Sequence, residues 1–206
     1  MSKDFEIAPK FRCSDWKNLN LDSTEEVTAD WVKGIGALEA RLNDRFIFPA
    51  DELVKLGNDQ KGTKQRFGFA ILALDFIVLE TLAAFRKGVG DHNGQSKSLC
   101  SDFLSEWSIF KNSFTPNEPI KKEAIEFYKS CRCGIHHSGS TNSGLTVGIS
   151  GDTFQIVEGQ VAIINRTKFH DGIKSEFKSY LSELHMPVNA ELRCKFKAKM
   201  NFIVGF

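Results

Sequence analysis

The stretch KQRFGFAILALDFIVLETLAAFRK, residues 64–87, holds the strongest helical pattern in the chain. Its apolar residues recur at spacings of three and four, namely Phe67, Ile71, Leu74, Val78, Leu82 and Phe85. Alanines and further apolar residues widen this stripe, which predicts a helix at the centre of the core. The part from Phe67 to Leu79 contains Asp75 and is followed by Glu80, so it is too short and too charged to span a bilayer.

Helical spacing of apolar residues also marks the segments on either side. We expect helices over residues 23–42, capped by Ser23-Thr24, and over residues 43–57, 98–114, 118–133 and 167–185. The segment 188–202 is predicted to be a short helix or an edge element. Residues 1–22 show no clear periodicity, which indicates an extended or loosely packed lead-in.

Residues 144–165 differ, because apolar and small polar residues alternate there. Gly151-Asp152 and Glu158-Gly159 read as turns, which predicts a two- or three-stranded antiparallel meander. The predicted fold is therefore mainly α, a helical bundle with a small antiparallel β-meander near residues 144–165. We expect one domain over residues 1–206, with a bundle core over about 24–140 and C-terminal helices over 167–202.

The composition is that of an ordinary soluble globular protein. A net charge of +1 over 206 residues excludes a global basic field, so a nucleic-acid site would be a local patch. The 18 phenylalanines, against two tyrosines, predict a core packed with rings. Five scattered cysteines and an N-terminus without an apolar signal core indicate free thiols in a cytoplasmic protein.

A possible reaction centre, RCGIHH at residues 132–137, stands where the predicted helix 118–133 ends. Arginine binds phosphate through a planar fork, and histidine takes and returns a proton near neutrality, so the two suit phosphodiester cleavage. On an ideal helix Arg132 and His136 share a face, whereas Arg132 and His137 diverge by roughly 140°. His137 reaches Arg132 only if Gly134 ends or loosens the helix, or if a second copy supplies the histidine.

This motif and the earlier segment LALDFIVLETL (72–82), followed by FRKG (85–88), resemble bacterial members of the HEPN superfamily (higher eukaryotes and prokaryotes nucleotide-binding) over residues 64–140. The hallmark of that family is Arg-x4-6-His near the end of a bundle helix. The resemblance implies a homodimeric helical bundle that cleaves RNA without metal or cofactor at a site shared across the two-fold axis. Arg132 and His137 match the hallmark, and His136 falls where many relatives carry an aliphatic residue. Cys133 departs from the pattern, because active members often carry Asn, Asp or His after the arginine.

Two carboxylates in the predicted central helix need partners if they are buried. Either Glu80 or Asp75 orients Arg132, or its helix, across the core, or both carboxylates lie on the one polar edge of the helix. His170 and His185 are interpreted as helix-surface residues.

A competing zinc site would use Cys131, Cys133, His136 and His137. Cys131 and Cys133 point about 200° apart on a helix, and their spacing matches no Cys-x2-Cys pattern, so we expect no metal there. A Cys–His nucleophile pair has no further support in the chain.

The sequence thus favours a metal-independent endoribonuclease acting by 2′-OH attack. Arg132 would stabilise the phosphorane, and His137, or alternatively His136, would transfer the proton. A toxin or defence role and an antitoxin or regulatory partner follow from the resemblance alone, and no membrane partner is expected. The alternative is a non-catalytic HEPN-like module that binds nucleotide, RNA or protein.

Overall fold

The computed structural model describes residues 4–22, 24–58, 67–116, 119–141 and 144–205. This described part is mainly helical, with 65% helix. Contacts group the chain into two compact units, of which unit 1 holds residues 1–45, 84–92 and 175–206, and unit 2 holds residues 46–83 and 93–174. Two long helices, α4 (Gly68–Lys87) and α9 (Arg166–Leu184), contribute residues to both units. The single domain expected over residues 1–206 stays a prediction.

Unit 1 is built from both ends of the sequence. It contains the hairpin β1 (Glu6–Ala8) and β2 (Phe11–Arg12), then α1 (Cys13–Lys17), α2 (Ala29–Leu42) and α10 (Ala190–Val204). Trp16 packs edge-on against Phe196 at 5.7 Å between centroids, and its indole N–H donates to Asn201 Oδ1 at 2.8 Å. For the described residues 4–22 the loosely packed alternative is therefore wrong, whereas the extended one holds for β1 and β2; the last segment is a full helix.

Unit 2 contains the remaining elements. They are α3 (Phe48–Asn58), most of α4, α5 (Ser96–Glu106), α6 (Ser108–Lys111), α7 (Ile120–Tyr128), the π-helical turn η2 (Lys129–Cys133), α8 (Gly134–Ser138), β3 (Thr146–Gly148), β4 (Phe154–Val157), β5 (Gln160–Asn165) and the first half of α9. A second π-helical turn, η1 (Asn43–Ile47), connects α2 to α3.

The predicted helices are confirmed, but several ends are shifted. The helix expected over 23–42 begins only at Ala29, because Thr28 caps it by accepting from the Trp31 N–H at 3.4 Å. The helix expected over 98–114 breaks at Trp107, whose ψ of 118° is extended. The helix expected over 118–133 runs on to Ser138. Residues 23, 64–66 and 118, which the predictions also covered, lie outside the described residues.

Aromatic rings fill the core of unit 2, as the phenylalanine-rich composition predicts. Phe76 of α4, Phe127 of α7 and Phe169 of α9 pack with centroids 5.6 to 6.3 Å apart. Phe154 of β4 meets Phe127 and Phe169 edge-on at 5.4 and 5.9 Å. Each fully buried ring contributes about 1.5–3 kcal/mol relative to exposure, so this cluster determines how α4, α7, α9 and β4 pack together.

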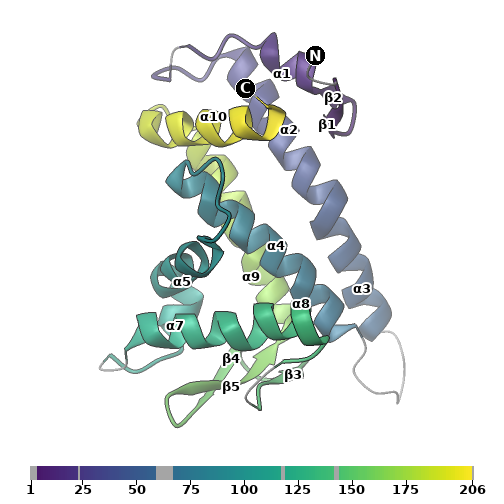
Figure 1. Cartoon of the computed structure of the whole chain (residues 1–206), viewed down its shortest axis with the longest axis vertical. Coiled ribbons are helices and arrows are strands. Elements are labelled where there is room, and N and C mark those ends of the chain that lie inside the picture. Colours follow the sequence, from purple (N-terminus) through teal and green to yellow (C-terminus); the bar gives the residue numbers. More distant parts are fainter. Residues whose placement is uncertain (1–3, 23, 59–66, 117–118, 142–143, 206) are drawn as a thin grey trace. The chain divides into compact units, whose positions relative to one another are not determined.

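The sheet of unit 2 is mixed, with the strand order β3-β5-β4, and Figure 1 shows it beside α7. β4 and β5 form the expected hairpin, whose turn residues Glu158 (φ 50°) and Gly159 (φ 74°) both have the left-handed backbone of a type I′ turn. β3 instead pairs with β5 in parallel. The prediction of an antiparallel meander is therefore wrong for β3, because alternation identifies a strand but not its neighbour.

A buried polar network joins three helices of unit 2. Asp75 of α4 and His170 of α9 are each 1% exposed, and His170 Nδ1 lies 2.6 Å from Asp75 Oδ1. The other ring nitrogen, Nε2, lies 3.1 Å from Asp51 Oδ1 of α3, and Lys174 Nζ donates to the same oxygen at 2.6 Å. The interpretation of His170 as a surface residue is wrong, and so is the polar-edge alternative for Asp75.

The pKa values of Asp75 and His170 are both raised, for different physical reasons. Burial raises the pKa of Asp75 to about 6, although the hydrogen bond and charge of His170 oppose the rise. Burial alone would lower the pKa of His170, but the hydrogen bonds and charges of Asp75 and Asp51 outweigh it and raise that pKa above 6.5. The two carboxylates therefore favour the protonated form of the His170 ring, whereas burial favours the protonated form of Asp75.

We predict that His170→Gln lowers the free energy of unfolding, and that the loss is larger at about pH 6 than at about pH 9. The folded pKa of His170 exceeds the unfolded value of 6.5, so the native state binds the proton more tightly. That stability is fully present below the unfolded pKa and is lost as pH rises through the folded pKa.

Urea unfolding of the wild type and the variant at both pH values measures this difference. His185→Gln, which changes an exposed histidine, is the matched control. A gap between wild type and His170→Gln that is equal at both pH values would contradict the prediction.

Candidate functional site

The Arg132–His137 motif lies on one continuous helical run of unit 2, formed by α7, η2 and α8 (Figure 1). η2 is a π-helical turn, which takes an extra residue into the helix and occurs often at functional sites. The run continues through Gly134 and ends at Gly139, whose φ of 63° is left-handed. Gly134 does not end the helix, so that half of the alternative is wrong; the run is loosened instead at η2, which stops immediately before Gly134.

Arg132 and His136 line one cavity of about 80 Å³ against α4. Arg132 lies in η2 and His136 lies four residues further on in α8, and the two share a face, as the spacing predicts. Ala73 and Ile77 of α4 form the apolar side of the same cavity. His137 is exposed, with its ring centroid 5.4 Å from that of His136, and the described lining of the cavity does not include it. Within one chain, the structure therefore brings His136 rather than His137 to Arg132.

Glu80 of α4 is the carboxylate that meets Arg132. Arg132 Nε lies 3.4 Å from Glu80 Oε2, and the two side chains are 28% and 12% exposed. The hydroxyl of Ser96, at the start of α5, donates to the other carboxylate oxygen. A partly shielded pair keeps more of its Coulomb attraction than a pair in open solvent. Glu80 thus holds the guanidinium in place, while part of the guanidinium remains open to a ligand.

Asp75, the other carboxylate offered as a partner of Arg132, belongs to the buried network with His170 instead. Four residues of these polar clusters were not identified from the sequence, namely His170, Asp51, Lys174 and Ser96. His170 has a detectable signal, because it shares helical spacing with the buried residues Ile173 and Phe177. Ser96 has none, because it lies two residues before the helix predicted over 98–114 and takes part in no pattern there.

The groups around Arg132 are mostly neutral at physiological pH. Burial raises the pKa values of Cys100 and Tyr128, and the nearby charge of Arg132 only partly opposes the rise. Burial likewise raises the pKa of Cys131. Thiols with a raised pKa are poor nucleophiles, so neither Cys100 nor Cys131 suits the Cys–His alternative. Cys100, Tyr128 and Cys131 therefore add no charge next to the contact between Arg132 and Glu80.

The zinc alternative is not supported by the arrangement of the possible ligands. In the described part of the chain, no group of three or more His, Cys, Asp and Glu side chains could hold a metal ion. Cys131 is fully buried, whereas His136 and His137 face solvent. These side chains therefore do not converge on one point.

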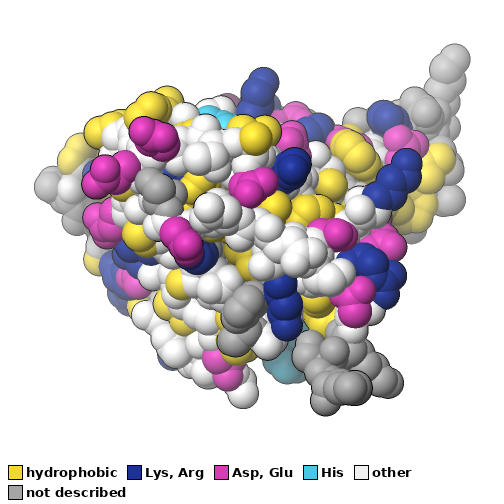
Figure 2. All heavy atoms as spheres, turned by 90° about the horizontal axis from the view of Figure 1, so that it is seen from above, with side chains coloured by type: hydrophobic (Ala, Val, Ile, Leu, Met, Phe, Trp, Pro, Cys, Tyr) yellow, Lys and Arg dark blue, Asp and Glu magenta, His cyan; other side chains and the backbone are white. Residues whose placement is uncertain are grey.

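The surface carries mixed charge. On the face shown in Figure 2, Lys and Arg side chains alternate with Asp and Glu, and no broad field of one sign covers it. This pattern agrees with the net charge of +1. On this face, a polyanion would have to bind through a few local contacts.

No protein-family model, curated protein or solved structure matches this chain. By length and composition α4 could cross a membrane, but 56% of its most apolar window is buried inside the protein, as in the core helix of a soluble protein. This observation is weak evidence in either direction.

For the RNA cleavage that the Arg132–His motif leads us to expect, Glu80→Gln should lower the rate about tenfold, equivalent to about 1.4 kcal/mol, while changing the free energy of unfolding by less than about 1 kcal/mol. Glutamine keeps the shape of the side chain and an acceptor for Ser96, but it removes the charge that holds the guanidinium of Arg132. Cleavage rate and urea unfolding, measured on the same samples, separate the two effects.

Glu126→Gln is the matched control, because Glu126 forms an exposed ion pair with Lys129 on the same helical run. An unchanged cleavage rate in Glu80→Gln, or a loss of cleavage that only follows a loss of folding, would refute the orienting role of Glu80.

Proposed function

We propose that this chain is a metal-independent endoribonuclease with a HEPN-like helical bundle, and that Arg132 and a histidine of the pair His136 and His137 form its reaction centre. The observation that carries the proposal is the shared cavity, in which a fixed cation and an imidazole line the same wall. The resemblance of residues 64–140 to HEPN ribonucleases supports the same assignment.

The chemistry follows from the two side chains. The 2′-OH of RNA attacks the adjacent phosphorus, the P–O bond to the 5′-oxygen breaks, and negative charge grows on the phosphorane oxygens. Arg132 stabilises that charge better than it stabilises the ground state, which lowers the barrier. The histidine accepts the 2′-OH proton or donates a proton to the leaving 5′-oxygen. The products are a 2′,3′-cyclic phosphate and a free 5′-hydroxyl.

His136 is the favoured proton carrier within one chain, because it lines the cavity beside Arg132. His137 matches the family hallmark, and it is exposed next to His136. In the proposed homodimer a second copy packs over Ile77, which is 43% exposed and lines the same cavity. His137 of one copy then approaches Arg132 of the other, so the site is shared across the two-fold axis.

The biological setting belongs to the same proposal and rests on the resemblance alone. The enzyme acts in the cytoplasm as a toxin or defence nuclease, and an antitoxin or other regulatory protein controls it. Membrane association forms no part of the proposal.

A second candidate is a non-catalytic HEPN-like module that binds nucleotide, RNA or protein. The observation that favours it is the contact between Arg132 and Glu80, because a carboxylate 3.4 Å from the guanidinium offsets part of the charge needed in the transition state. Cys133, which follows the arginine, favours it too.

We predict that the wild-type protein cleaves single-stranded RNA in the presence of EDTA. Arg132→Ala should slow the cleavage about 10²–10³-fold, as loss of a charge-stabilising donor does. Replacement of the acting histidine by alanine should slow it about 10²–10⁴-fold. Gel analysis of a labelled RNA with His136→Ala and His137→Ala identifies which histidine acts.

His185→Ala, which removes an exposed histidine far along the sequence from the motif, should cleave at the wild-type rate. If the wild-type protein binds RNA but does not cleave it, the non-catalytic binding module is the correct assignment. Full activity of the Arg132→Ala variant would contradict the proposal that Arg132 belongs to the reaction centre.

A further inference from the structure

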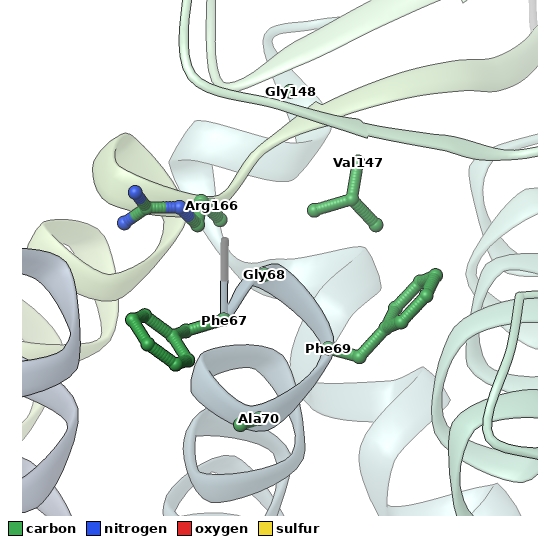
Figure 3. Close-up of a pocket in the computed structure, with 7 residues that line it drawn as sticks. All are labelled: Phe67, Gly68, Phe69, Ala70, Val147, Gly148 and Arg166. Carbon is green, nitrogen blue, oxygen red and sulfur yellow. The ribbon is translucent and has the colours of Figure 1, made fainter. Parts of the chain in front are cut away.

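A second cavity opens where α4 begins, next to the three-stranded sheet of unit 2. Its volume is about 210 Å³, and its walls include Phe67, Phe69, Val147 and Arg166. Figure 3 shows the rings of Phe67 and Phe69 on opposite sides of Gly68, with Val147 facing Phe69 and Arg166 on the side of Phe67. The walls are thus mainly apolar and aromatic, with one cationic side chain.

Close packing and a strained backbone, rather than a loose fit between elements, form the walls of this cavity. A Cβ on Gly68 would lie 2.8 Å from Val147 Cγ1, so the first turn of α4 approaches β3 as closely as glycine permits. Phe67 has a φ of 63°, which is rare for a bulky residue and costs about 1–3 kcal/mol. Phe69 is 42% exposed, so its ring remains available to a ligand.

Arg166 is the charged side chain among the residues that line the cavity; its Cδ lies beside Gly68, and its Nη1 donates to the Thr167 hydroxyl at 3.4 Å. It is the first residue of α9 and is only 1% exposed. Its guanidinium is planar, offers several N–H donors and stacks on flat ring systems. A ligand that combines a flat apolar face with hydrogen-bond acceptors matches this set of groups. A nucleobase has both properties.

The size of the cavity also points to a single base. Sites for drug-sized ligands typically enclose about 300–1,000 Å³, which is more than this cavity provides. One base fits the smaller volume. Aromatic side chains bind unpaired bases by stacking, which is tolerant of sequence because every base has a π-face.

This cavity adjoins the proposed reaction centre along α4. Phe69 and Ala73 are four residues apart and lie on the same face of the helix, separated by one turn, or about 6 Å. Ala73 lines the cavity that holds Arg132 and His136. An extended strand with one base against Phe69 therefore brings a neighbouring phosphate toward Arg132.

We propose that this cavity is a subsite for one unpaired nucleobase of single-stranded RNA, whose backbone continues to Arg132 and His136. The inference rests on the proposed ribonuclease function and names its substrate class. The subsite gives the sheet a role, because β3 contributes one wall through Val147. A paired base cannot enter, since in A-form RNA the bases are stacked inside the helix.

The test uses wild-type protein and a 2′-O-methyl RNA strand of about 12 nucleotides, which cannot be cleaved by 2′-OH attack. Fluorescence anisotropy gives its affinity and that of the corresponding duplex. Phe69→Ala should weaken single-strand binding about 5- to 150-fold, which corresponds to the affinity lost when one base no longer stacks on an aromatic ring. Phe69→Trp should restore binding, because indole also stacks, and the duplex affinity should not change.

Phe48→Ala is the matched control, because Phe48 is an exposed phenylalanine of the same unit, in α3. Circular dichroism verifies that each variant is folded. Ala70→Trp, at an exposed position in the cavity wall, should block the cavity and weaken single-strand binding as Phe69→Ala does. Equal single-strand affinities for wild type, Phe69→Ala and Ala70→Trp would overturn the subsite.

The two proposals fail separately. If the wild type cleaves RNA and Phe69→Ala leaves KM and affinity unchanged, the subsite is wrong and the ribonuclease stands. If binding depends on Phe69 but the wild type does not cleave, the ribonuclease is wrong and the base subsite stands in a binding module.

Discussion

The rotation of α4 about its own axis in unit 2 depends on one constraint, the burial of Asp75 in the middle of an apolar helix. A carboxylate that is 1% exposed requires a partner, and His170 of α9 provides it at 2.6 Å. Because Asp75 must face α9, positions 73 and 77, which lie about 200° around the helix from it, face the other way. This rotation of α4 presents Ala73 and Ile77 to Arg132 and His136. The buried pair therefore sets the geometry of a site to which it does not itself belong.

The elements that could be predicted from sequence are those governed by local pattern. The central helix, the phenylalanine core and the β4–β5 turn at Glu158-Gly159 follow from periodicity, composition and turn chemistry. The partners of those elements could not be predicted in the same way. The parallel pairing of β3 with β5 and the contact of His170 with Asp75 both join residues distant in sequence, so single-segment patterns carry little information about them.

In the candidate site, too, the local arrangement could be predicted from sequence and the long-range contacts could not. Spacing alone indicates that Arg132 shares a face with His136, and the structure places both on one cavity. It does not indicate that Arg132 lies in a π-helical turn or that the helix continues through Gly134. Nor does it choose between Asp75 and Glu80 as the partner of Arg132, a choice that depends on the rotation of α4. That helix connects the two cavities, since Phe69 lines one and Ala73 the other.

The central claim is that Arg132 and its neighbouring histidine promote attack by a 2′-OH. The most direct measurement uses a DNA strand that carries a single ribonucleotide, incubated with the wild-type protein in EDTA, followed by mass spectrometry of the ends. The account predicts cleavage only on the 3′ side of the ribonucleotide, with a 2′,3′-cyclic phosphate and a 5′-hydroxyl, and no cleavage of the all-deoxy strand. Cleavage of the all-deoxy strand, or products that end in a 3′-hydroxyl, would contradict it.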